Sequence, residues 1–171
     1  VERIDSVKTK KARRTEFELL IKAIQKENIE QFDGVPLDNE LVSLEDKDCK
    51  TLCSYAAEVQ NTYFLSKVLR AGADVNHVDN YGNTPLFEAV LKSNYEVIKE
   101  LLEAGADVNH VNNNDGRTPL FEAVLKSNYE VIKVLLDAGV NVNHEADDGS
   151  TPLFEAVRNS NYEVIKVLID A

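Results

Sequence analysis

Methionine is absent from the sequence, cysteine occurs only twice, and no long apolar segment is present. No stretch approaches the roughly 18 consecutive apolar residues that a transmembrane helix needs. A signal-peptide pattern and N-x-S/T glycosylation sites are also missing. We therefore expect an intracellular, cytoplasmic protein with no membrane-spanning part. Because the chain starts at Val1 and contains no methionine, we expect it to be a piece of a longer protein.

Catalytic signatures are missing as well. The sequence contains no nucleophile elbow, no HExxH, no phosphate-binding loop and no GxGxxG. The formal net charge of -11 disfavours binding to nucleic acid or to an anionic membrane surface. We therefore expect no enzyme activity and no cofactor, and we expect a basic partner.

Residues 1–14 are an exception to the acidic composition, with a local charge of +4. The run from Lys8 to Arg14 is similar to a short nuclear-import or phosphate-binding cluster. A simpler interpretation is a solvated basic lead-in to the first helix, so both interpretations stay open. The basic residues of this stretch are Arg3, Lys8, Lys10, Lys11, Arg13 and Arg14.

The dominant pattern in the chain is an internal repeat. The stretch Asn83–Asn109 reads NTPLFEAVLKSNYEVIKELLEAGADVN and returns twice with few changes and once in a degenerate form. Its opening threonine recurs at spacings of 33, 34 and 33 residues, as Thr51, Thr84, Thr118 and Thr151. A fixed period of this length indicates a solenoid of stacked units, of which at least about three are needed for stability.

Each unit reads as a pair of helices. Thr84 is a good N-cap, Pro85 suits the first helical position, and Leu86, Ala89 and Val90 form one apolar face. We expect this first helix to end near Ser93 and Asn94, and we expect capping boxes to start the second helix of each unit. The boxes are Ser93 with Glu96, Ser127 with Glu130 and Ser160 with Glu163.

The second helix carries its own apolar face and ends at Gly105, which suits the left-handed conformation after a helix. Its predicted core residues are Val97, Ile98, Leu101 and Leu102.

The motif TPLFEAV, followed by a second helix and AGADVNH, resembles the ankyrin repeat over about residues 46–171. The resemblance implies an all-α solenoid whose helix pairs are linked by short β-hairpin-like loops. The turn glycines would be Gly82, Gly116 and Gly149. The family usually has a histidine after Thr-Pro-Leu, whereas this chain has phenylalanine, and we expect a row of buried rings. The row consists of Phe87, Phe121 and Phe154.

The repeat divides the chain into six segments. A shift of 66 residues aligns Leu20–Ile24 with Leu86–Val90, which indicates a degenerate capping repeat before the regular ones. Its second helix should be short because Asp33-Gly34 and Pro36 interrupt it, and Leu37–Asp46 should be irregular. The segments are a basic lead-in (1–14), the capping repeat (15–45), a divergent repeat (46–78), two regular repeats (79–112 and 113–145) and a truncated repeat (146–171), with Asn112 as a single insertion.

Metal binding is disfavoured by the same repetition. His77, His110 and His144 occupy equivalent positions in successive units, which is too far apart for one ion. Cys49 and Cys53 could form half a metal site or a redox pair. However, Cys53 stands one period before Leu86, so a small core residue is the simpler interpretation.

An acidic ladder is the first candidate for a binding surface. Glu88, Glu122 and Glu155 occupy a helix position that points to the concave, partner-facing side in ankyrin-like proteins. The alternative is a solvated helix face with lysine partners at i+4, namely Lys92 and Lys126. Glu155 would have no such partner, because Asn159 replaces the lysine.

The hairpin tips are the second candidate, because they differ between units whose helices are nearly identical. Partners of ankyrin-like proteins bind at these tips and at the first-helix surface, although relaxed selection on exposed loops would give the same variation. Leu91 and Leu125, replaced by Arg158, add a modest apolar patch. The variable tip residues are Asn80, Tyr81, Asn83, Asn114, Asp115, Arg117, Asp147, Asp148 and Ser150.

We interpret the chain as a monomeric, noncatalytic protein-interaction module, a scaffold or adaptor that binds a basic or amphipathic segment. The alternatives are the targeting or regulatory part of a larger enzyme, a host-directed effector acting in host cytoplasm, and a structural spacer. The resemblance also implies candidate sites for asparaginyl hydroxylation at Asn76, Asn109 and Asn143.

Overall fold

The computed structural model describes residues 2–171, with side chains from residue 9 onward. This part of the chain contains eleven helices and no strand, which confirms the all-α expectation. The helices are α1 (Glu2–Gln25), α2 (Ile29–Asp33), α3 (Asn39–Val42), α4 (Leu52–Glu58), α5 (Thr62–Arg70), α6 (Pro85–Leu91), α7 (Tyr95–Glu103), α8 (Pro119–Leu125), α9 (Tyr129–Asp137), α10 (Pro152–Arg158) and α11 (Tyr162–Ile169).

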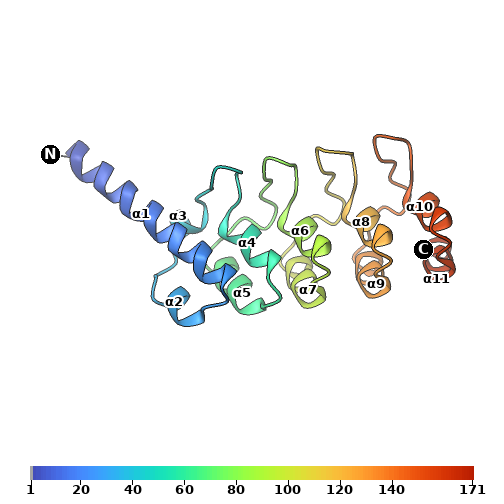
Figure 1. Ribbon diagram of the computed structural model, residues 1–171, viewed down its shortest axis with the longest axis horizontal. Coiled ribbons are helices and arrows are strands. Elements are labelled where there is room, and N and C mark those ends of the chain that lie inside the picture. The colour runs from blue at the N-terminus through green and yellow to red at the C-terminus, as the bar shows by residue number, and fades with distance from the viewer. Residues whose placement is uncertain (1) are drawn as a thin grey trace.

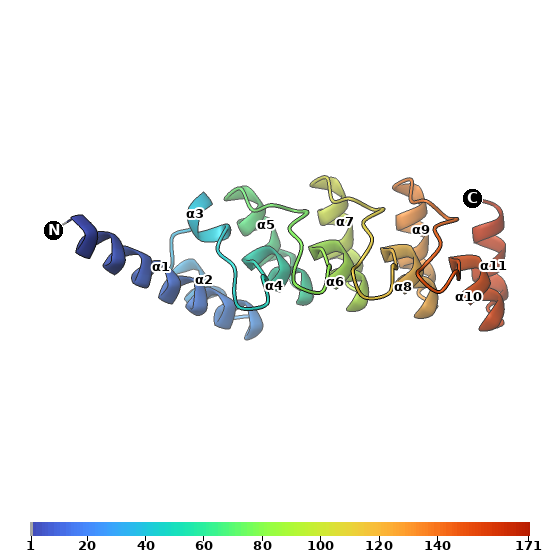
Figure 2. The same cartoon turned by 90° about the horizontal axis from the view of Figure 1, so that it is seen from above.

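The helix pairs stack side by side into an elongated solenoid (Figure 1). Helices α4, α6, α8 and α10 form one layer, and α5, α7, α9 and α11 form the other (Figure 2). The loops that precede the first helix of each pair all project from the same edge. Since every unit contacts only its neighbours, the stack presents one continuous row of loops and one row of first helices.

The threonine caps are confirmed. The hydroxyls of Thr84, Thr118 and Thr151 each accept the N–H of the phenylalanine three residues later. Proline occupies the first turn of all three helices, where the missing N–H costs nothing. Thr51 caps α4 in the same way without a proline, by accepting from the Ser54 N–H.

The predicted capping boxes at serine are wrong by one residue. The N-cap residues of the second helices are asparagines, and Asn128 accepts the N–H of Val131. The preceding serines instead adopt the left-handed conformation, with φ of 57° at Ser93 and 54° at Ser127 and Ser160. A sharp turn between two helices needs one left-handed residue, and here that residue is serine.

One hydrophobic core runs through the whole stack. Leu86, Ala89 and Val90 of the first helix are buried as predicted, as are Val97, Ile98 and Leu101 of the second. Leu102 is only partly buried.

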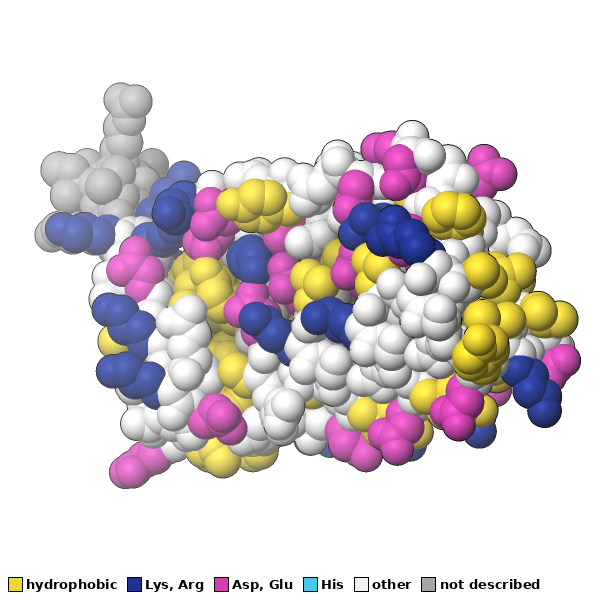
Figure 3. Space-filling model, turned by 45° about the vertical axis from the view of Figure 1, so that its right-hand side comes forward, with side chains coloured by type: hydrophobic (Ala, Val, Ile, Leu, Met, Phe, Trp, Pro, Cys, Tyr) yellow, Lys and Arg dark blue, Asp and Glu magenta, His cyan; other side chains and the backbone are white. Residues whose placement is uncertain are grey.

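The expected row of buried rings is interrupted at its end. Phe121 is 0% exposed and Phe87 is also buried, but Phe154, at the open end of the stack, is 57% exposed. The same open end shows apolar side chains gathered around α10 and α11 (Figure 3).

The N-terminal segment is one long helix. Helix α1 continues through the expected boundary at residue 14 without a break, so the basic stretch is helical rather than a separate lead-in. Phe17, Leu20, Ala23 and Ile24 of this helix are buried, as a capping unit requires. The side chains of Arg3 and Lys8 lie outside the described residues.

The rest of this capping unit differs in one respect from the expectation. The second helix, α2, is short as predicted, with five residues. The segment expected to be irregular, residues 37–46, contains the four-residue helix α3, which the side chain of Asp38 caps by accepting the Leu41 N–H.

Candidate protein-interaction face

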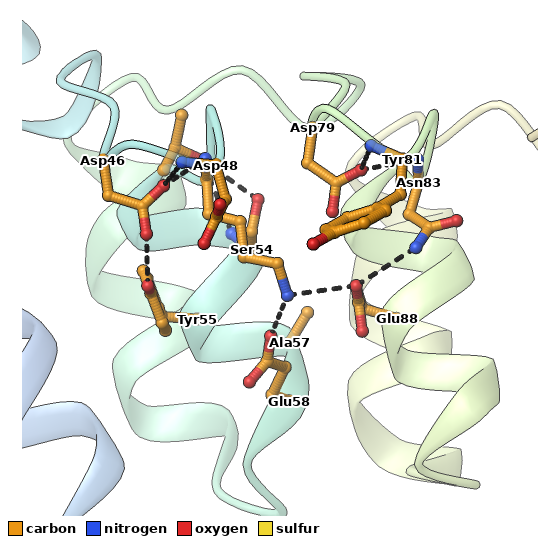
Figure 4. A network of polar contacts seen from close by, with 12 residues as sticks. Asp46, Asp48, Ser54, Tyr55, Ala57, Glu58, Asp79, Tyr81, Asn83 and Glu88 are labelled. Carbon is orange, nitrogen blue, oxygen red and sulfur yellow. Dashed lines mark hydrogen bonds and ion pairs between the residues drawn. The ribbon is translucent and has the colours of Figure 1, made fainter. Parts of the chain in front are cut away.

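Each hairpin tip is closed by one side chain that binds the backbone of its own loop. Asp79 Oδ1 accepts the N–H groups of Tyr81 and Asn83, both at 2.9 Å, and the Asp79 N–H donates to the Asn83 carbonyl at 3.0 Å (Figure 4). Asp46 closes the preceding tip in the same way by accepting from Asp48 and Lys50. Turns that are closed on themselves hold their exposed side chains in fixed positions.

The single insertion lies elsewhere than predicted. Asn112 is buried and occupies the closing position, because its Oδ1 accepts the Arg117 N–H at 3.0 Å and its N–H donates to the Arg117 carbonyl at 2.9 Å. The closing pair is therefore five residues apart here, against four between Asp79 and Asn83. The extra residue lies within the tip, between Asn112 and Arg117.

Neighbouring tips are joined by backbone hydrogen bonds. The N–H of Asn80 donates to the carbonyl of Asp48 at 3.0 Å, and the N–H of Asp147 donates to that of Asp115 at 3.0 Å. The N–H of Asn113 donates to the Tyr81 carbonyl at 3.3 Å, which joins the tips in front of α6 and α8. These bonds explain the hairpin-like form of the loops, although the described residues contain no β-strand.

Gly82 makes this close approach feasible. Its φ is +79°, and an added Cβ would lie 2.3 Å from the Asn113 nitrogen of the next tip. Only glycine combines this φ with such a backbone contact. The tips therefore form a continuous, rigid ribbon along one edge of the solenoid.

The three histidines add a second set of bonds between units. The Nε2 of His110 lies 2.9 Å from the Gly82 carbonyl, and that of His144 lies 2.8 Å from the Gly116 carbonyl. His77 reaches the Cys49 carbonyl in the same way at 2.9 Å. Because a carbonyl only accepts, each Nε2 donates, which fixes the tautomer of the neutral ring. The histidines therefore have a structural role. The only sequence feature that indicated this role was their recurrence at equivalent positions of successive units.

The candidate partner-binding residues differ in how accessible they are. Six of the fifteen side chains are exposed, five are partly buried and four are buried. The four buried side chains do not offer the free surface that was expected of them. The exposed set is Asn80, Tyr81, Asn114, Asp147, Asp148 and Arg158; the partly buried set is Leu91, Leu125, Asp115 and Arg117; the buried set is Asn83, Ser150, Glu88 and Glu155. Glu122 is partly buried as well.

The expected acidic ladder is not a free acidic surface. Glu88 is 7% exposed, and its Oε1 accepts from Lys50 Nζ at 3.1 Å and from Asn83 Nδ2 at 3.3 Å (Figure 4). Glu122 pairs with Arg117 at 3.2 Å, and Glu155 lies 2.9 Å from Arg158. Each carboxylate is therefore neutralised by a cation on the same face.

The identity of these cations also differs from the expectation. Lys92 and Lys126 are exposed, and in the described residues neither forms an ion pair with the glutamates. Glu155, expected to lack a partner, has Arg158 at i+3 instead. A sequence signal for the Glu122 pair exists, since Arg117 precedes Glu122 by five residues across the Thr-Pro turn.

Lys50 and Asp46 show how strongly this face is organised. Burial lowers the pKa of Lys50, but the carboxylates of Glu58 and Glu88 outweigh that effect, so the pKa is raised above its usual 10.5. Burial raises the pKa of Asp46, but bonds from the Tyr55 hydroxyl and from backbone N–H groups outweigh it and keep the pKa below 3.8. Both groups stay charged near neutral pH.

The cysteines are separate thiols. Cys53 is fully buried, which confirms its interpretation as a core residue, and burial raises its pKa to about 12. Cys49 occupies the turn-glycine position with φ of 58°. Within the described residues, no group of three or more histidine, cysteine, aspartate or glutamate side chains could hold a metal ion.

The candidate hydroxylation sites take part in the loops between units. The Oδ1 of Asn76 accepts the Asp107 N–H at 2.8 Å, and that of Asn109 accepts the Asn141 N–H at 2.7 Å. Asn143 is exposed in the last unit. Modification of any of the three stays a prediction.

The stacked helix pairs, capped by threonine and joined through hairpin tips, define a helical-repeat solenoid. A family model described as ankyrin repeats (3 copies) matches residues 19–112 and 108–171. The chain therefore belongs to the ankyrin repeat family. Ankyrin repeats generally mediate protein–protein interactions and are typically noncatalytic. A search of curated proteins returned no match. Among the described residues, no helix has the length and apolarity required to span a membrane.

Proposed function

We propose that this chain is a noncatalytic module that binds another protein along its hairpin tips and the adjoining surface of the first helices. The observation that carries the proposal is the contrast between a repeated framework and a variable ribbon. Helices α6, α8 and α10 are nearly identical in sequence, whereas the tips in front of them differ at exposed positions. A rigid row of unlike side chains is what selective recognition requires.

The chemistry of this ribbon favours a basic or amphipathic segment. Asp147 and Asp148 are exposed at the last tip, and the chain carries a formal net charge of -11. Tyr81 is 51% exposed at the tip in front of α6 and offers an aromatic ring, while Leu91 and Leu125 add partly buried apolar surface. Complementary charge mainly speeds encounter and selects between partners.

In this proposal the three paired glutamates stabilise the face and do not contact the partner. Glu88, Glu122 and Glu155 lie beneath or beside the tips, each next to a cation. They hold the face together, and the contacts with the partner come from the exposed tip side chains.

A comparison of two variants tests the proposal. The tip variant carries Tyr81→Ala, Asn114→Ala and Asp147→Ala, three exposed positions whose side chains form no hydrogen bond in the described residues. The control variant carries Glu96→Gln, Glu130→Gln and Glu163→Gln, which are exposed at the starts of α7, α9 and α11. Both variants should unfold at the same temperature as the wild type.

Wild-type protein and both variants are then used as bait in quantitative affinity purification. Proteins recovered with the wild type should be retained by the control variant and lost from the tip variant. Equal recovery with the tip variant would contradict a binding site on the ribbon.

The cellular location belongs to the same proposal. The module acts in the cytoplasm as a monomer, and exposed Lys10 and Lys11 on α1 are the residues that could direct it to the nucleus. A fluorescent fusion of the chain with Lys10→Ala and Lys11→Ala tests this role. A nuclear signal that is unchanged by both substitutions would exclude it.

A further inference from the structure

Arg117 shows how this fold holds a guanidinium group. Its Nε lies 3.0 Å from Asp115 Oδ2, and its Nη1 donates to Glu122 Oε1 at 3.2 Å. The guanidinium carbon lies 5.0 Å from the centroid of the Phe121 ring. Two carboxylates and one aromatic face therefore bind a single planar cation, which is the arrangement that suits arginine.

Asp115, Phe121 and Glu122, the three groups that hold Arg117, form a guanidinium receptor. The next unit repeats this receptor without the arginine. A shift of 33 residues converts Asp115, Phe121 and Glu122 into Asp148, Phe154 and Glu155. The same shift replaces Arg117 by Ser150. The last unit thus keeps the three groups that hold a guanidinium and lacks the side chain that supplies one.

These groups line one open cavity. Asp148, Gly149, Ser150, Phe154, Glu155 and Arg158 surround a volume of about 150 Å³. The cavity is open to solvent and leaves room for a planar guanidinium.

The state of Glu155 indicates what the cavity would bind. Its side chain is only 3% exposed, and its Oε2 forms an ion pair with Arg158 at 2.9 Å but accepts no hydrogen bond. A buried carboxylate oxygen without a donor costs free energy until a donor reaches it. The exposed ring of Phe154 lies beside it and can cover a bound cation.

Arg158 is the one cation already present in this cavity. Its Nη2 lies 2.9 Å from Glu155 Oε2, but its side chain is 63% exposed and the contact lacks hydrogen-bond geometry. The positions equivalent to Arg158 in the two preceding units are Leu91 and Leu125, so this arginine is not part of the repeated receptor. Because most of the Arg158 side chain is exposed, it can move into solvent when another cation binds Glu155.

We propose that the cavity formed by Asp148, Phe154 and Glu155 binds an arginine side chain of the partner protein. The inference rests on the proposed function and names the side chain that the ribbon recognises at its last tip. The guanidinium pairs with both carboxylates and lies over the Phe154 ring, in the way that Arg117 pairs with Asp115 and Glu122 and lies over the Phe121 ring one unit earlier. A lysine ammonium can pair with carboxylates, but it is a point charge without the planar face that stacks on the ring.

The experiment uses small probes, so it does not depend on knowing the partner. Nα-acetyl-arginine amide is titrated into ¹⁵N-labelled protein, with the amide signals of Ser150, Phe154 and Glu155 followed by NMR. The citrulline counterpart has the same shape without the charge, and the lysine counterpart has the charge without the planar fork. Saturable shifts at these three amides are expected with the arginine probe and much weaker ones with the other two. Equal shifts with all three probes, or no saturable shift with arginine, would overturn the proposal.

Two variants provide opposite expectations. Ser150→Arg supplies the missing side chain from within the chain, so it should block the arginine probe while preserving the rest of the spectrum. Arg117→Ser empties the preceding receptor and should create a second set of saturable shifts, at Phe121 and Glu122. Unchanged binding to Ser150→Arg would contradict the assignment of this cavity even if other variants fail to fold.

Two further variants measure the contributions of single side chains. Glu155→Gln should weaken probe binding by about tenfold or more, since it removes a charged acceptor. Arg158→Leu installs the residue of the other units and should strengthen binding by removing a competitor. If the wild type binds nothing and only Arg158→Leu binds, then Arg158 fills the cavity permanently and the proposal is wrong.

Failure here is distinguishable from failure of the proposed function. Loss of partners from the tip variant combined with no arginine binding would reject this cavity and retain the ribbon as the interaction site. Arginine binding combined with equal recovery of partners by the tip variant would leave the cavity intact and reject the ribbon.

Discussion

Lys50 Nζ lies 2.5 Å from Glu58 Oε1 in its own unit and 3.1 Å from Glu88 Oε1 in the next. One ammonium group thereby ties α4 to α6 on the face that carries the hairpin tips (Figure 4). All three side chains are largely buried. This contact makes Glu88 a structural residue of the face rather than a free acidic group.

Glu88→Gln should therefore reduce stability without reducing partner binding. Removing the charge leaves Lys50 with one carboxylate in a mostly buried site, for which a loss of about 1–3 kcal/mol in the free energy of unfolding is expected. Urea unfolding measures it, and Glu96→Gln on an exposed position is the matched control. An equal effect of the two substitutions would contradict a structural role for the Lys50–Glu88 pair.

The middle and last members of the phenylalanine row should respond differently to replacement by alanine. Phe121→Ala should cost about 3–5 kcal/mol because the ring is fully enclosed. Phe154→Ala should cost about 1 kcal/mol or less, since more than half of this ring is exposed. Thermal or urea unfolding of the two single variants checks the difference. Similar losses would mean that another surface covers Phe154 in solution.

The helix-start assignment predicts opposite results at adjacent residues. Asn128→Ala should cost about 1 kcal/mol because the asparagine side chain caps α9. Ser127→Gly should cause no loss, since glycine adopts a φ of 54° more readily than serine. If Ser127→Gly destabilises the protein as much as Asn128→Ala, the cap is shared between the two residues.

The lowered pKa of Asp46 predicts part of the loss of stability at low pH. Its pKa is held below 3.8 in the folded chain, so its contribution to stability is present above that value and is lost as pH falls further. Asp46→Asn should therefore be less stable than the wild type at pH 7, and the difference should shrink below about pH 3.8. Urea unfolding across this range tests it. A difference that stays constant with pH would show that the Asp46 charge contributes nothing.

Local sequence rules predicted the framework well. The Thr-Pro starts, the apolar faces and the glycine after α7 depend on a few adjacent residues, so the pattern alone specifies them. The capping boxes failed because Ser-Asn offers two adjacent N-cap candidates. The choice depends on which residue takes the left-handed turn, and that turn is set by how the two helices pack.

The proposed binding face could be predicted only in part. Variation at the tips located the ribbon, but the burial of Glu88 and its bond to Lys50 involve residues 38 apart in different units. Charge pairing across units depends on which rotamers fit between the loops, and no spacing rule within one unit contains that information. The insertion was misplaced for the same reason, since Asn112 is identified as the closing residue only by its bond to Arg117.

Site-specific photocross-linking tests the central claim most directly, which is that a partner binds along the ribbon of tips. A benzophenone amino acid replaces Tyr81 at a tip or Tyr95 at the start of α7, both of which are exposed aromatic positions. In cells that contain the partner, Tyr81 should yield a cross-linked protein that is absent from the Tyr95 sample. A cross-link from Tyr95 with none from Tyr81 would place the partner on the second helices and contradict the account.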